Sequence, residues 1–180
     1  GVMQALLATT DSGGVVPPPN PPHDIPWGIF TNANLIAGNK MQAPAGAYTS
    51  GGSSTEILPA NTAGDLQLTL LQVTTSRLFG IGATGTGGGF NRMTHCIDIE
   101  PGGAMYIFQS GVNVAGPLAT TVANDVLKID ITAANVVTYL LTGVVKYTSL
   151  VAKSGSVYAN ATVPNTNNIC ENITLSGSFA

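Results

Sequence analysis

Apolar and polar residues alternate most clearly between residues 65 and 73. Leu66, Leu68 and Leu70 are separated by the polar residues Gln67 and Thr69. Successive side chains of a β-strand point to opposite faces, so the three leucines would share one face. The alternation therefore predicts a half-buried strand.

A second region of alternation runs from residue 124 to residue 149. Residues 125–131 and 135–141 are rich in Val, Ile, Leu and Tyr, and Thr142-Gly143 then leads into residues 144–149. Such residues favour strands, and a turn containing Gly between two of them is typical of a hairpin. We expect three successive antiparallel strands here.

The rest of the chain is divided into short apolar segments by clusters of Gly, Pro and Asn. Pro101-Gly102-Gly103 is the strongest of these turn signals. About ten short strands at intervals of roughly 8 to 12 residues, with no convincing helix, indicate an all-β antiparallel sandwich or barrel. Further strand candidates are residues 27–30, 34–37, 47–50, 77–82, 94–100, 104–109, 156–161 and 172–179.

The N-terminal part of the chain has a different pattern. Residues 1–10 are mostly apolar, residues 11–14 are a turn sequence, and five prolines lie between positions 17 and 22. A run of prolines forms an extended polyproline II segment rather than a helix or a central strand. The sequence thus predicts an arm at residues 1–14, a spacer at residues 15–24 and one domain at residues 25–180.

The apolar arm needs a surface that covers it, because it is too short to fold on itself. Its central side chains are Val2, Leu6, Leu7 and Ala8. It could dock on its own domain, or it could add as a strand to the sheet edge of a neighbouring subunit. The stiff spacer favours the neighbour, so we expect these four residues at a subunit interface.

The charge of the chain limits its partners. Only 8% of its 180 residues are charged, six of them are Lys or Arg, and the net charge is -3. This is too little basic charge to neutralise phosphates or bind an anionic membrane surface, so nucleic acid is an unsuitable partner. No apolar run approaches the roughly 20 residues that cross a bilayer as a helix.

The strands from residue 124 to residue 149 also resemble a known family. Residues 124–131 match a G-D-x-L-x-I strand, and residues 137–149 match V-x-Y-x-x-N-G-x-x-x-Y-T-S, except that Asn124 replaces Gly and Thr142 replaces Asn. This pattern is similar to that of concanavalin A-like jelly-roll domains. The resemblance implies an antiparallel jelly-roll β-sandwich, a fold shared by lectins, carbohydrate-binding modules, glycosidases, and viral and matrix proteins.

One strand invites comparison with jelly-roll glycosidases. Cys96-Ile97-Asp98-Ile99-Glu100 is similar to their E-x-D-x-E strand, and positions 96, 98 and 100 share one face. A retaining glycosidase needs two carboxyl groups roughly 5 Å apart, and Cys96 stands where the nucleophile would be. His95 points to the opposite face and cannot activate the thiol. We therefore expect no enzyme activity.

The sequence offers no cofactor site and no metal motif. The string Gly80 to Gly85 has the GxGxxG spacing but no helix follows it, so it is not a dinucleotide site. The aspartates are dispersed, and a calcium site could only be assembled from distant loops. Aromatic platforms for a sugar are available in number, but their apolar neighbours favour core positions. These aromatic residues are Trp27, Tyr48, Tyr106, Tyr139, Tyr147 and Tyr158.

Two features fit an exported protein. Cys96 and Cys170 match no zinc-ligand spacing and are expected to form a disulfide, with two buried thiols as the alternative. Asn160 and Asn172 each begin an N-glycosylation sequon. We expect an extracellular, cell-surface or virion-surface location.

Two functions follow from these observations. The first is a structural subunit that polymerises head to tail with copies of itself into an extracellular filament, pilus-like fibre or coat, because a heterologous contact that does not close generates a fibre. The alternative is a carbohydrate-binding, lectin-like module of an attachment or surface protein. The possible partners are therefore the chain itself and glycans.

Overall fold

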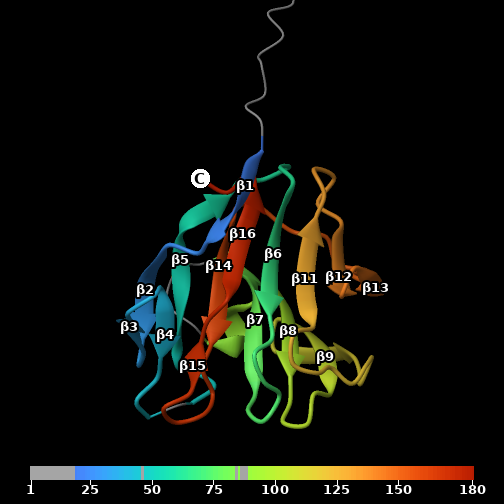
Figure 1. The fold of residues 1–180 in the computed structure, drawn as a ribbon. Helices are drawn as coiled ribbons and strands as arrows, with labels where there is room; N and C mark the ends of the chain where they lie inside the picture. Colours follow the sequence, from blue (N-terminus) through green and yellow to red (C-terminus); the bar gives the residue numbers. More distant parts are fainter. Residues whose placement is uncertain (1–18, 46, 84, 86–88) are drawn as a thin grey trace, which may run out of the picture.

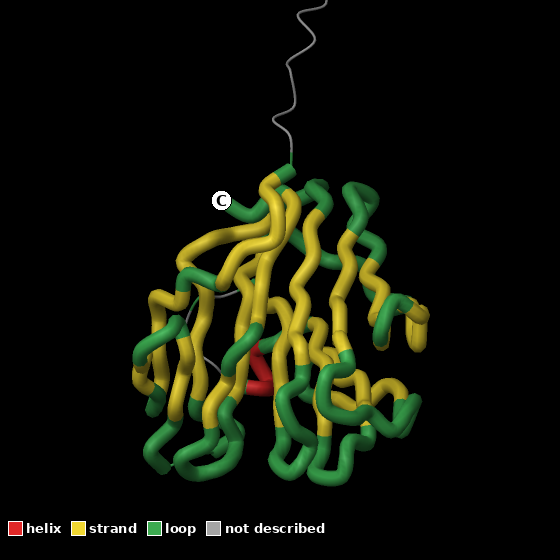
Figure 2. Tube along the Cα trace, in the orientation of Figure 1, coloured by secondary structure: helices red, strands yellow, loops and turns green. Residues whose placement is uncertain are grey.

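A computed structural model describes residues 19–45, 47–83, 85 and 89–180, and it shows two large antiparallel sheets packed face to face (Figures 1 and 2). The six-stranded sheet contains, in spatial order, β1 (Asn20–Asp24), β16 (Ile173–Gly177), β6 (Gly64–Thr69), β11 (Val126–Ile131), β12 (Val137–Leu141) and β13 (Val144–Thr148). The seven-stranded sheet contains β10 (Val112–Ala115), β9 (Met105–Gln109), β8 (His95–Ile99), β7 (Arg77–Gly82), β14 (Val157–Thr162), β5 (Gly51–Leu58) and β2 (Trp27–Thr31). A small third sheet consists of β15 (Ile169–Cys170), β4 (Lys40–Gln42) and β3 (Asn34–Ile36).

The core lies between the two large sheets. Leu66 and Leu68 of β6 are buried as the alternation predicts, and so are Leu127 and Ile129 of the neighbouring β11. Removing one such side chain from water stabilises a fold by about 1.5 to 3 kcal/mol. This burial explains why one face of each strand is apolar.

The predicted all-β, antiparallel jelly-roll sandwich is confirmed. Within the described residues the one helical element is the short 3-10 turn η1 (Phe90–Arg92). The predicted three-strand meander is β11, β12 and β13, and the turn at residues 101–103 joins β8 to β9 as a hairpin.

The structure differs from the sequence-based prediction next to β5. Residues 47–50 form a turn closed by a bond from the Ser50 N–H to the Ala47 carbonyl. The strand begins instead at Gly51, in a Gly- and Ser-rich segment of low strand propensity. Hydrogen bonds inside the sheet compensate for the low strand propensity of this segment. One of them is donated by Ser53 Oγ to Asn160 Oδ1 over 2.6 Å.

The predicted proline-rich spacer is wrong for residues 20–24. These residues are the edge strand β1, which pairs with β16 in an antiparallel register. Pro21 and Pro22 fit an edge strand because a residue without an N–H can face solvent there. The domain thus includes β1. The predicted arm at residues 1–14, with Val2, Leu6, Leu7 and Ala8, lies outside the described residues.

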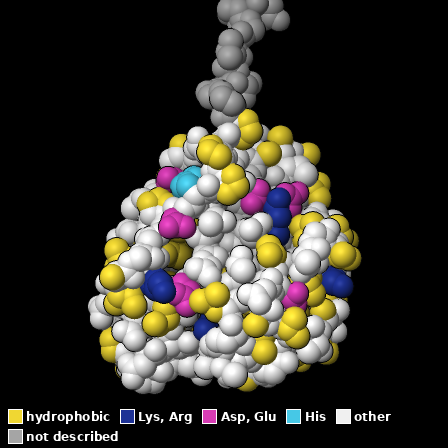
Figure 3. All heavy atoms as spheres, in the orientation of Figure 1, with side chains coloured by type: hydrophobic (Ala, Val, Ile, Leu, Met, Phe, Trp, Pro, Cys, Tyr) yellow, Lys and Arg dark blue, Asp and Glu magenta, His cyan; other side chains and the backbone are white. Residues whose placement is uncertain are grey.

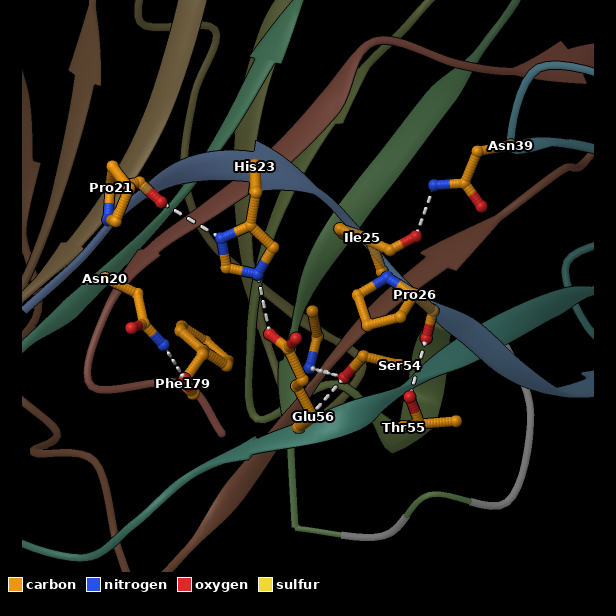
Figure 4. Close-up of polar contacts among 11 residues, drawn as sticks. Asn20, Pro21, His23, Ile25, Pro26, Asn39, Ser54, Thr55, Glu56 and Phe179 are labelled. Carbon is orange, nitrogen blue, oxygen red and sulfur yellow. Dashed lines mark hydrogen bonds and ion pairs between the residues drawn. The ribbon is translucent and has the colours of Figure 1, made fainter.

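Polar contacts hold β1 in place (Figure 4). His23 Nε2 lies 2.8 Å from Glu56 Oε2, and His23 Nδ1 lies 3.0 Å from the Pro21 carbonyl oxygen. Asn20 Nδ2 donates to the Phe179 carbonyl over 2.7 Å, which brings the two ends of the domain together. Both ring nitrogens of His23 face acceptors, so both can donate only when the imidazole is protonated.

We expect the attachment of β1 to weaken as the pH rises. The hydrogen bonds to Pro21 and Glu56 raise the pKa of His23 above 6.5. The contribution of protonated His23 to the stability of the β1 attachment is therefore complete below pH 6.5, and it is lost as the pH rises through the raised pKa of His23. In His23→Gln, amide hydrogen exchange at Asp24 and Ile25 should be about two- to fivefold faster than in the wild type at pH 5.5 and equal to it at pH 8.5. Lys146→Gln on the opposite edge is the control, and a difference that persists at pH 8.5 contradicts the prediction.

Candidate functional site

The face of the seven-stranded sheet that points away from the core carries polar side chains. On β8, Ile97 and Ile99 enter the core, so Cys96 and Asp98 point outward. We call this surface the outer face. Its strands place one row of residues in register, namely Thr31, Gly51, Thr162, Leu78, Asp98 and Tyr106.

Two segments cover the outer face. Phe90 of η1 packs against Phe108 with ring centroids 5.2 Å apart, and Tyr48 packs against Phe90 at 6.0 Å. The Phe90 N–H donates to the Tyr48 carbonyl, which fixes the two segments to each other. Beneath them Leu78, Met93 and Cys96 form a second apolar cluster. The outer face is therefore a covered surface and not an open sheet.

Asp98 and Glu100 form a carboxyl pair at one end of the covered surface. Burial, together with the charge of Glu100 and a side-chain hydrogen bond to it, raises the pKa of Asp98 to about 7. Ser76 Oγ donates to Glu100 Oε2 over 3.3 Å. Burial raises the pKa of Tyr48, and the charges of Glu100 and Asp98 act in the same direction. Tyr48 therefore lies beside the pair.

Two buried polar atoms of this row have no hydrogen-bond partner among the described residues. Asp98 Oδ1 and Thr162 Oγ1 are both shielded from solvent, and their side chains are 3% and 1% exposed. Leaving such a group unpaired costs about 1 to 3 kcal/mol. Buried groups of this kind are paired in most proteins, so these two atoms mark the outer face as unusual.

Cavities adjoin the segment that carries Tyr48. Ala47 and Ser50 line a pocket of about 410 Å³ together with Asn32 and Asn34. Thr49 lines a smaller pocket of about 130 Å³ with Thr31 and Arg92. Tyr48 itself is 48% exposed. A half-exposed aromatic ring in a segment whose neighbouring residues line such pockets is a suitable surface for a sugar ring.

A larger cavity lies elsewhere, along the outer side of the six-stranded sheet. It has a volume of about 820 Å³, and Pro21, Pro22, Ile131 and Ala133 provide apolar walls. Charged side chains on this side are few and scattered (Figure 3). Lys128 pairs with both Asp65 and Asp130, so these charges are neutralised locally.

Both cysteines are free buried thiols, and the predicted disulfide is wrong. Cys96 lies in the cluster of the outer face, whereas Cys170 belongs to the main core and pairs with Met41 in the third sheet. Burial raises the pKa of Cys96 well above its ordinary value and that of Cys170 to about 12. Neither thiol is a nucleophile at neutral pH.

The predicted glycosylation at Asn160 does not fit the fold. Its side chain is 1% exposed in β14, accepts a hydrogen bond from Ser53 and donates one to the Tyr158 carbonyl. A glycan on that nitrogen would break the buried network. Asn172 is exposed, and its glycosylation stays a prediction.

The other candidate residues divide between core and surface. Trp27 and Tyr139 are buried in the core, as the favoured interpretation predicts, and Tyr106, Tyr147 and Tyr158 are half buried. His95 faces the core, where Nδ1 lies 3.0 Å from the Tyr139 hydroxyl and burial lowers its pKa to about 4. Cys96 and His95 thus point to opposite faces, as predicted. Among the described residues no three His, Cys, Asp or Glu side chains gather as a metal site.

Solved structures with a similar fold include the SPRY domain of human HERC1. The two chains are 8% identical, the alignment covers 84% of this chain and 98% of that domain, and the TM-score is 0.58. The carbohydrate recognition domain of Emp47p is 10% identical, with coverage of 85% and 86% and a TM-score of 0.52. The chain has a concanavalin A-like jelly-roll fold. No protein-family model matches the chain, and no curated protein does. No helix in the described part of the chain is long and apolar enough to cross a membrane.

Proposed function

We propose that this concanavalin A-like domain is a carbohydrate-binding, lectin-like module whose glycan binds over the outer face beside Tyr48. The observation that carries the proposal is the half-exposed Tyr48 beside Asp98 and Glu100, on a face where Asp98 Oδ1 and Thr162 Oγ1 have no partner among the described residues. Sugars present an apolar ring face for stacking and hydroxyl groups for hydrogen bonds. The described site offers complementary groups of both kinds.

The similar structures support this proposal in one respect. The Emp47p domain, which shares the fold over most of both chains, is a carbohydrate recognition domain. Glycan binding is therefore a function that this arrangement of strands accommodates. The alternative function predicted from the sequence thus has more support than the filament subunit.

Replacing Tyr48 tests the proposal. Glycans that bind the wild type are first identified on an array, and their affinity is then measured by isothermal titration calorimetry. Tyr48→Ala should weaken binding about tenfold or more through the loss of stacking, whereas Tyr48→Phe should keep most of the affinity. Leu150→Ala is a matched control because Leu150 is 95% exposed and remote in sequence from Tyr48. Failure to bind any glycan, or equal affinities for Tyr48→Ala and the wild type, would contradict the proposal.

The head-to-tail homopolymer stays a prediction, because its donor strand lies in residues 1–14. The described feature that favours it is the free edge β13, where Val144 and Val145 are 57% and 55% exposed. The extracellular, cell-surface or virion-surface location likewise stays a prediction.

A further inference from the structure

The outer-face site has an uncompensated negative charge at one end. Asp98 and Glu100 are hydrogen-bonded to each other, and their known neighbours Ser76 and Tyr48 are uncharged at neutral pH. The in-register neighbours of Asp98 on the adjacent strands are Leu78 and Tyr106, which are also uncharged there. The net charge of the pair is negative, and it lies beside uncharged neighbours.

Among the described residues, the ion pairs join His23, Lys40 and Lys128 to other carboxylates, and none of them includes Asp98 or Glu100. Arg92 lines the small pocket with Thr31 of β2. Arg77 Nη1 donates hydrogen bonds to Thr75 Oγ1 and to the Ser76 carbonyl. The guanidinium charge of Arg77 interacts with Cys170 and Glu171.

The polar atoms of this end of the site are acceptors. Asp98 Oδ1 has no partner, and Glu100 is half buried with an open side toward solvent. An ammonium group carries three N–H donors and one positive charge, so it matches the charge of the pair and can donate to Glu100, the member of the pair that solvent reaches. A carboxylate or sulfate group would meet repulsion at the same position.

We propose that the site takes a glycan with a free amino group, whose ammonium group lies against the Asp98–Glu100 pair while a sugar ring stacks on Tyr48. This inference rests on the proposed carbohydrate-binding function and adds the chemical class of the ligand. It excludes uronic-acid and sulfated polymers as ligands of this site.

The test compares three hexasaccharides at pH 6.0 by isothermal titration calorimetry. A glucosamine hexamer carries ammonium groups, the corresponding N-acetylglucosamine hexamer replaces each of them with a neutral acetamide, and a galacturonic acid hexamer carries carboxylates. We expect the wild type to bind the glucosamine hexamer about tenfold more tightly than the acetylated one, and not to bind the acidic one. Raising the salt concentration from 0.05 M to 0.5 M should reduce this preference.

The Glu100→Gln variant links the preference to the pair. It should reduce the affinity for the glucosamine hexamer about tenfold and change the affinity for the acetylated hexamer less than twofold. Asp130→Asn removes a carboxylate from the six-stranded sheet and should change neither affinity. A loss of folding would lower the apparent affinity for both hexamers equally. A change in the ratio of the two affinities therefore reports on the site and not on folding.

The outcomes separate the two proposals. If the acetylated hexamer or other neutral glycans bind at Tyr48 without a preference for the amine, the carbohydrate-binding function stands and the ligand class is wrong. If the ratio is unchanged in Glu100→Gln, the acid pair does not select the ligand. If no hexamer binds, the ligand class is wrong, and the glycan array then tests whether the domain binds any other carbohydrate.

Discussion

Asp98→Asn is expected to stabilise the protein at pH 8 by about 2 to 4 kcal/mol, which corresponds to a rise in melting temperature of roughly 5 to 12 °C. Burial, with the charge and hydrogen bond of Glu100, raises the pKa of the Asp98 carboxyl from 3.8 to about 7. At pH 8 the folded wild type therefore holds a buried carboxylate beside Glu100. Asparagine resembles the protonated acid and can donate to Glu100 without a charge.

The sign follows from the linkage between protons and folding. The folded state binds the proton of Asp98 more tightly than the unfolded chain, so this group favours folding below about pH 4 and loses that contribution as the pH rises toward 7. The difference between the two limits is about 4 kcal/mol. Urea unfolding at pH 4 and pH 8 should show this fall in the wild type, beyond that of other groups, and not in Asp98→Asn.

The control for this variant is Asp130→Asn. The Asp130 side chain is 43% exposed and pairs with Lys128, so its removal should leave the pH dependence almost unchanged. Parallel pH profiles for the wild type and Asp98→Asn would show that Asp98 is not a buried acid. A lower stability of Asp98→Asn at pH 8 would also contradict the prediction.

Gly80→Ala is expected to reduce the free energy of unfolding by about 3 kcal/mol or more. Gly80 lies in β7, opposite Cys96 of β8 and Asn160 of β14. A Cβ atom at this position would lie 2.1 Å from the His95 carbonyl oxygen and 2.9 Å from the Cys96 Cα. Both are backbone atoms of the neighbouring strand, so the clash can be relieved only by moving the sheet.

Gly155→Ala provides a matched control for this variant. Gly155 has a φ of +64° but no atom within 4 Å of an added Cβ, so alanine there meets backbone strain of about 1 to 2 kcal/mol without a clash. Urea denaturation of both variants measures the difference. Equal losses of stability at the two positions would be evidence against the steric argument.

Much of the fold could be predicted from alternation and turn residues. The strands around Leu66, around Ile129 and around Tyr139 are apolar on one face, and this pattern depends on burial in the core. β5 could not be predicted, because its Gly and Ser residues become a strand through partners such as Asn160 that are distant in sequence. Tertiary contacts outweigh local propensity at this position.

The candidate site was predictable only in part. Strand alternation alone places Asp98 and Glu100 on one face, as the sequence analysis expects. Tyr48, Ser76 and Thr162 reach the same surface from other strands or from a turn, and nothing local in their sequence marks them. The expectation for Cys170 failed for a related reason, since spacing says nothing about which sheet a cysteine joins.

The pairing of β1 with β16 has a consequence for how such a domain can be joined to others. Asn20 and Phe179 are hydrogen-bonded, and Ala180 exchanges two backbone hydrogen bonds with Ile57, so the chain enters and leaves the sandwich at neighbouring points (Figure 1). A unit with adjacent ends can be placed inside a surface loop of a host protein without stretching that loop. The same geometry permits a circular permutant in which a short linker joins residues 180 and 19 and new ends open at the exposed turn between β12 and β13.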